Sequence, residues 1–178
     1  MDKPNKVVCG VVLALLLAIP ARADDLKLPL PPSNFAFQDR WSLGLTLGEP
    51  TGVVLKRHLG NGQAWDLGIG GGPGLRVYGD YLWTLASITP QNSGLNFRIQ
   101  LGGGAFVGVL SGWCSFYGKF DGCSNDPYVG VRVPFEVEMW PARAPLNFGI
   151  EIAPGLAAAP NRFGGLVDAN LFVRFLLN

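Results

Sequence analysis

The chain has few of the residues that most catalytic and metal sites use. It contains one histidine, His58, and three cysteines, and charged residues make up only 15% of its 178 positions. Because two of the cysteines are expected to be bridged, too few ligands remain for a metal, and we expect no cofactor. The formal net charge is +1 and no basic stripe is present, which argues against a nucleic-acid partner.

Long apolar runs are also scarce. The longest, Val7 to Ile19, spans roughly 13 residues, fewer than the about 20 that a membrane-spanning helix needs. It follows Lys3 and Lys6, and a small-x-small cleavage site ends at Ala23. We therefore predict a signal peptide over residues 1–23 and export from the cytoplasm. Residues 24–40 are Pro-rich and aperiodic, and we interpret them as an extended leader.

Export makes a disulfide the expected state of the two cysteines that survive cleavage. Cys114 and Cys123 lie close together in the longest predicted loop, residues 110–126. In the predicted topology this loop is extracellular and is the first place to look for a partner. Four aromatic residues in it are candidates for exposure: Trp113, Phe116, Tyr117 and Phe120.

What the sequence has is alternation of apolar and polar residues. In the stretch from Tyr128 to Trp140, every second residue from Val129 to Met139 is apolar, and Arg132, Glu136 and Glu138 lie between them. This period of two predicts a strand with two unlike faces. The stretch is long enough for a bilayer, which takes about 9–11 tilted residues.

Seven further segments alternate in the same way. The fold class predicted for residues 41–178 is therefore all-β, an eight-stranded antiparallel up-and-down transmembrane β-barrel. The glycine run at residues 102–104 and Pro134 are each expected to hold a β-bulge. The eight predicted strands are 41–48, 51–59, 63–71, 75–83, 94–109, 128–140, 146–156 and 166–177.

The same alternation would also suit a soluble lipocalin-like barrel with its charges outside. Two observations favour the membrane. The polar face is rich in glycine, which makes room inside a narrow barrel for long charged side chains. Four tryptophans fall at one end of the predicted strands, as an interfacial aromatic girdle would. They are Trp41, Trp65, Trp83 and Trp140.

The polar face carries nearly balanced charges. In so narrow an interior, unpaired charges would be costly, so we predict a charge network that plugs the lumen. Its expected centre is Arg132 with Glu136, Glu138 or Glu151. The complete predicted set is Lys56, Asp66, Arg76, Asp80, Arg98, Arg132, Glu136, Glu138, Glu151, Asp168 and Arg174.

Four short motifs carry a resemblance. They are the turn at residues 48–52 with the following Lys56 strand, Asp80-Tyr81-Leu82-Trp83, the segment at residues 130–134, and Glu151-Ile152-Ala153-Pro154. The chain resembles a family of small bacterial outer-membrane β-barrel proteins of unassigned function, with an OmpX-like plan. The resemblance implies outer-membrane lipid and the barrel-insertion machinery as partners. The chain departs from such barrels by ending in Leu177-Asn178 without a terminal aromatic residue.

The sequence predicts a monomeric, non-enzymatic barrel in the bacterial outer membrane, with a structural or surface-interaction role. Catalysis lacks support because His58 falls near the periplasmic end of its strand, without a nucleophile and acid to join it. We interpret it as a hydrogen-bonded wall residue. A narrow solute channel is the main alternative, and a lipid-modifying enzyme is a third.

Overall fold

The structure is a computed structural model, and it describes residues 40–72, 74–90, 94–109, 127–141, 144–160 and 162–177. The predicted signal peptide, nearly all of the Pro-rich leader and the 110–126 loop lie outside these ranges. In the ranges described, every regular element is a β-strand. None of the described residues form a helix that is long and apolar enough to cross a membrane.

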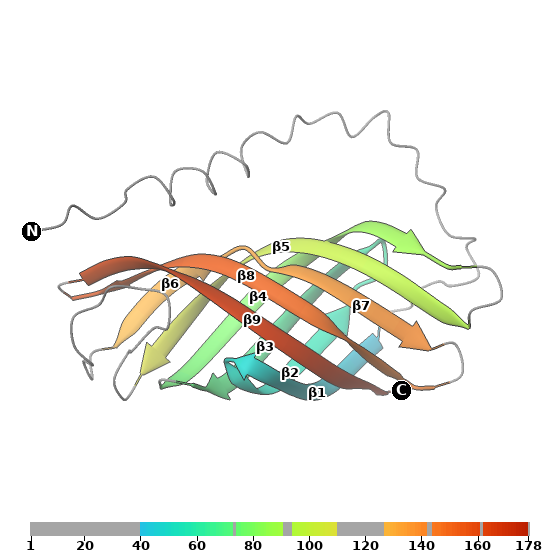
Figure 1. Cartoon of the computed structure of the whole chain (residues 1–178), viewed down its shortest axis with the longest axis horizontal. Coiled ribbons are helices and arrows are strands. Elements are labelled where there is room, and N and C mark those ends of the chain that lie inside the picture. The colour runs from blue at the N-terminus through green and yellow to red at the C-terminus, as the bar shows by residue number, and fades with distance from the viewer. Residues whose placement is uncertain are drawn as a thin grey trace, which may run out of the picture. The chain divides into compact units, whose positions relative to one another are not determined.

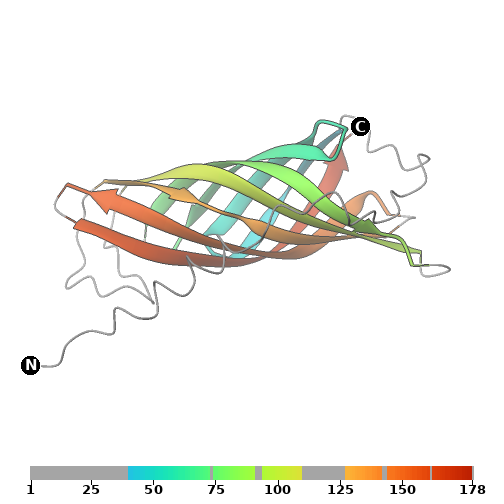
Figure 2. The same cartoon turned by 90° about the horizontal axis from the view of Figure 1, so that it is seen from above.

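Nine strand segments make one antiparallel sheet that closes on itself. The ladder from β1 to β9 completes the ring, with pairs from Trp41 opposite Leu177 to Glu49 opposite Ala169. The strands run obliquely around the ring (Figures 1 and 2). The segments are β1 (Arg40–Glu49), β2 (Thr51–His58), β3 (Gln63–Gly71), β4 (Leu75–Ile88), β5 (Leu95–Val109), β6 (Tyr128–Arg132), β7 (Phe135–Pro141), β8 (Leu146–Ala159) and β9 (Arg162–Leu177).

β6 and β7 are two halves of one predicted strand, so the ring has eight members. Both halves lie between β5 and β8. Two ends can then be named. The terminal end is where β1 begins and β9 ends, and the loop end is where β5 ends and β6 begins.

The ring has a polar interior and an apolar exterior. In β1, Ser42 and Thr46 are buried, whereas Leu45 and Leu47 are 61% and 62% exposed. The same alternation of buried and exposed positions runs through the other strands. The charged face is therefore inside, which is the opposite of the lipocalin-like alternative.

The break between β6 and β7 differs from the bulge expected at Pro134. The register of β5 is the same on both sides of the break, with Gly104 opposite Arg132 and Leu101 opposite Phe135. Pro134 therefore interrupts the strand without adding a residue. Its carbonyl still accepts a hydrogen bond from the Gly102 amide, 2.9 Å away, but a proline has no N–H to return it.

A second proline faces the same point from the other side. The Val133 amide donates to the Pro154 carbonyl over 2.9 Å, and again the reciprocal bond cannot form. One strand thus loses a ladder bond to each neighbour at adjacent residues.

Two other expectations need correction. The register shift in the ring lies between Thr84 and Ala86 of β4, and the glycine run at 102–104 pairs regularly. The segment between the predicted strands 146–156 and 166–177 was expected to be a loop, but residues 157–159 and 162–165 extend the β8–β9 hairpin, with Ala157 opposite Gly164 and Ala159 opposite Arg162. Strand formation here follows from pairing along the long hairpin, which overrides the weak strand preference of alanine and glycine.

The interior has an apolar part that the sequence did not predict. Near the loop end, five buried side chains pack together inside the ring. Charged side chains therefore do not fill the interior along the whole length of the ring. The five are Tyr78, Phe106, Tyr128, Ala157 and Leu166.

Candidate functional site

The strand period directs the charged side chains into the ring. On β7, Glu136 and Glu138 point inward, while Phe135, the first residue of the strand, is on the outer face. All eleven charged residues predicted for the lumen are buried, with at most 4% of any of them exposed. Nine of them form two clusters, named here after their central cations, and the other two, Arg98 and Asp66, lie beside the lysine cluster.

The lysine cluster consists of Lys56, Gln100, Glu136, Glu138 and Arg174. Lys56 Nζ donates to Glu138 Oε1 over 2.8 Å and to Glu136 Oε2 over 3.0 Å, and to Gln100 Oε1 over 2.6 Å. Arg174 Nη1 donates to both glutamates, at 3.1 Å for Glu138. Two cations thus share two carboxylates, which compensates for their burial.

The arginine cluster consists of Arg76, Asp80, Arg132, Glu151 and Asp168. Arg132 donates to both oxygens of Asp80, with Nε 2.9 Å from Oδ1, and also pairs with Glu151 at 3.1 Å. Its Nη1 lies 3.2 Å from Asp168, whose other oxygen accepts from Arg76 over 2.6 Å. Arg132 therefore contacts three carboxylates from three different strands.

The predicted centre of the network was right in part. Of the three expected partners of Arg132, Glu151 pairs with it. Glu136 and Glu138 belong to the lysine cluster instead. Arg132 lies on β6 and the two glutamates lie beyond Pro134 on β7, so proximity along the strand did not identify the partner. Asp80 and Asp168 reach Arg132 from other walls of the ring.

Aromatic rings on the inner face cover glycines of the neighbouring strand. Tyr78 is the cross-strand partner of Gly68, and a Cβ on that glycine would meet the tyrosine ring at 2.1 Å. Phe172 lies in the same way over Gly149. The absence of a side chain at these glycines is what lets a large ring lie flat against the wall.

The same two rings each stack on an arginine, one from each cluster. The Arg132 guanidinium carbon is 4.0 Å from the Tyr78 ring centroid, and that of Arg174 is 3.8 Å from Phe172. Stacking of this kind fixes a guanidinium while leaving its edge free to bind carboxylates. Each cluster is therefore built as a layer of glycine, ring, arginine and carboxylate.

His58 lies inside near the terminal end and is 1% exposed. Its Nδ1 is 3.0 Å from Arg98 Nη1. Its ring packs edge to face against the Trp140 ring, with the two ring centroids 5.2 Å apart. Arg98 is 3.8 Å from Glu138. The histidine thus borders the lysine cluster.

Trp140 differs from the predicted girdle. It is 8% exposed and points inward, where its Nε1 donates to Glu138 Oε2 over 3.1 Å. The signal was present in the sequence, because residue 140 shares the parity of Glu136 and Glu138. The other three tryptophans of the predicted girdle lie on the outer face. The ring centroids of Trp41 and Trp65 are 5.1 Å apart in an edge-to-face contact, and the Arg57 guanidinium carbon lies 5.2 Å from the Trp41 ring centroid. Trp83 is 49% exposed.

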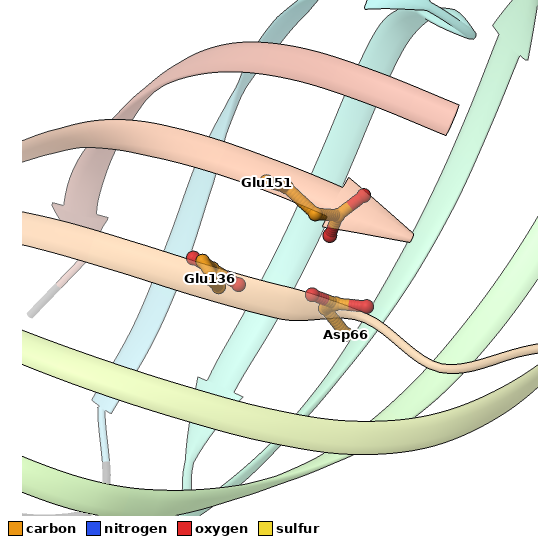
Figure 3. A group of neighbouring side chains, drawn as sticks. All are labelled: Asp66, Glu136 and Glu151. Carbon is orange, nitrogen blue, oxygen red and sulfur yellow. The ribbon is translucent and has the colours of Figure 1, made fainter. Parts of the chain in front are cut away.

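Three carboxylates from two sides of the ring converge between the clusters. Asp66, Glu136 and Glu151 each offer an oxygen, and these oxygens lie within 4.8 Å of one another (Figure 3). Glu136 and Glu151 are direct partners on β7 and β8. Asp66 comes from β3, far round the ring, so sequence spacing held no signal for this group.

The other predicted features of the site fall outside the described residues. These are the Cys114–Cys123 disulfide and the loop aromatics at 113, 116, 117 and 120. Both stay predictions. No family model, curated protein or solved structure matches the chain.

Proposed function

We propose that the chain is an integral outer-membrane β-barrel, with a structural or surface-interaction role and a lumen filled by charged and aromatic side chains. One observation carries this proposal. Charged side chains are buried inside the ring, while large apolar ones such as Leu45, Leu171 and Phe175 are more than half exposed on its outer face. A soluble protein buries its apolar face. The reverse arrangement suits a ring surrounded by lipid.

Strand length and the outer aromatic residues support the same proposal. β4 and β8 are 14 residues long and β5 is 15, more than the about 9–11 that a tilted strand needs to cross a bilayer. Trp41, Trp65 and Trp83 gather on the outer face near the terminal end. Tryptophan prefers the boundary between lipid and water, so this end would lie at the membrane surface.

A filled interior favours an anchoring role over transport. The charged residues of both clusters pair across the ring, and the loop end is filled by the apolar cluster around Tyr78. Conducting pores usually have rings of one charge sign facing water. We propose no catalytic role for His58, whose ring is packed between Arg98 and Trp140.

The first test is the gel mobility of the membrane fraction with and without boiling. A closed barrel resists detergent and migrates differently until it is heated, so the unboiled band should shift on boiling. Recovery of the protein in the soluble fraction, with no shift, would contradict the proposal.

A second test locates the outer face directly. Variants that each keep a single tryptophan are refolded in vesicles that contain brominated lipid, which quenches fluorescence on contact. Trp83 should be quenched strongly. Trp140, which shares the terminal end but lies inside, is the matched control and should be protected. Equal quenching of the two would show that the outer face does not contact lipid.

A further inference from the structure

Two pairs of carboxylates face each other across neighbouring strands inside the ring. Glu136 is the cross-strand partner of Glu151, and Asp66 is the partner of Asp80. Like charges directly opposite each other destabilise a sheet. Lys56, Arg132 and Arg174 compensate three of these four carboxylates through short ion pairs.

Asp66 is the member of the group with the weakest compensation. It is 1% exposed, and neither carboxylate oxygen has a hydrogen-bond partner among the described residues. The ion pair that the structure gives it, with Arg174 Nη2, is 3.9 Å long. A buried carboxylate without hydrogen bonds is costly, and its oxygens point towards those of Glu136 and Glu151 (Figure 3).

Among the described residues, the interior of the ring is short of positive charge. The buried cations of the described residues are Lys56, Arg76, Arg98, Arg132 and Arg174, five against six buried carboxylates. The six are Asp66, Asp80, Glu136, Glu138, Glu151 and Asp168. With His58 neutral, one further positive charge would balance the interior.

We propose that Asp66, Glu136 and Glu151 bind one small, oxygen-preferring metal cation. Carboxylate oxygens are the ligands such ions prefer. Oxygens on opposite sides of an ion with bonds of about 2.4 Å lie about 4.8 Å apart, so the separation in the group fits one shared ion. Sodium would balance the interior charge, while calcium uses the same ligand chemistry and leaves one positive charge. This inference does not depend on the ring lying in a membrane.

Equilibrium dialysis of the folded protein against radioactive sodium or calcium ions, with choline chloride holding the ionic strength constant, tests the site. We expect one ion bound per chain. Binding should also raise the temperature at which tryptophan fluorescence reports unfolding, because an ion that binds only the folded state stabilises it. The two arms distinguish sodium from calcium.

Asp66→Asn removes one ligand charge with little change of shape, and it should abolish both binding and the temperature shift. Glu49→Gln on β1, outside the group, is the matched control and should retain both. Wild-type protein that binds neither ion and shows no shift overturns the proposal. Unchanged ion binding in Asp66→Asn would overturn it as well, because the ion would lie elsewhere.

Discussion

Replacing Arg132 by methionine should destabilise the ring more than any other single loss of a cation in the arginine cluster. Arg132 is 1% exposed and contacts Asp80, Glu151 and Asp168. Removing one partner of a buried ionic network costs about 3–5 kcal/mol, because the carboxylates stay buried without compensation. The variant also loses the stacking on Tyr78.

The assay is urea unfolding of the protein refolded in detergent micelles, followed by tryptophan fluorescence and gel mobility. Arg57→Met is the matched control, since Arg57 lies on the outer face over the Trp41 ring. A cation–π contact at an exposed site contributes about 0.5–1 kcal/mol, and Arg57 is only partly buried and outside both clusters, so the control should lose less stability than Arg132→Met. Adding Asp80→Asn to Arg132→Met should recover part of the lost free energy of unfolding, because the second substitution removes one uncompensated charge. An Arg132→Met variant no less stable than the control would refute the ion-network reasoning.

Three further predictions can be checked separately. Gly68→Ala should lower the free energy of unfolding by about 1–3 kcal/mol, since the new methyl group meets the Tyr78 ring. Gly103→Ala, where a methyl group meets nothing within 4 Å, should lower it little. Equal urea midpoints for the two variants would contradict the packing argument. Cys114 and Cys123 should resist alkylation in the unreduced, unfolded protein, and two labelled thiols would exclude the bridge. The wild-type protein in a planar bilayer should show no stable openings, and well-defined, ion-selective openings would favour the channel over the plug.

The alternation of residues was enough to predict the strands and the inward face. Leu43, Leu45 and Leu47 recur on one side of β1, and an inward-facing set follows from parity alone wherever one register holds. Trp140 lies inside because its parity, and not its position at a strand end, decides which face it occupies. The register shift near Leu85 was missed because no glycine or proline marks it.

Contacts across the ring could not be predicted in this way. Which carboxylate meets Arg132 depends on the stagger between strands, and the alternation of one strand carries no information about it. The pairing of Tyr78 with Gly68 likewise follows from the β3–β4 register. The sequence predicted which charged residues lie inside, and the three-dimensional arrangement was needed to say which of them touch.

The prolines at 134 and 154 have a mechanical consequence. In a ring held by continuous ladders, a strand pulled from one end detaches as a single unit. Here the Val133–Pro134 junction lacks one ladder bond on each side, so β6 and β7 are attached to their neighbours as separate lengths. β6 contributes Tyr128 to the apolar cluster, and β7 contributes Glu136 and Glu138 to the lysine cluster. Under a stretching force this strand should therefore come away in two steps, with the junction as the stopping point.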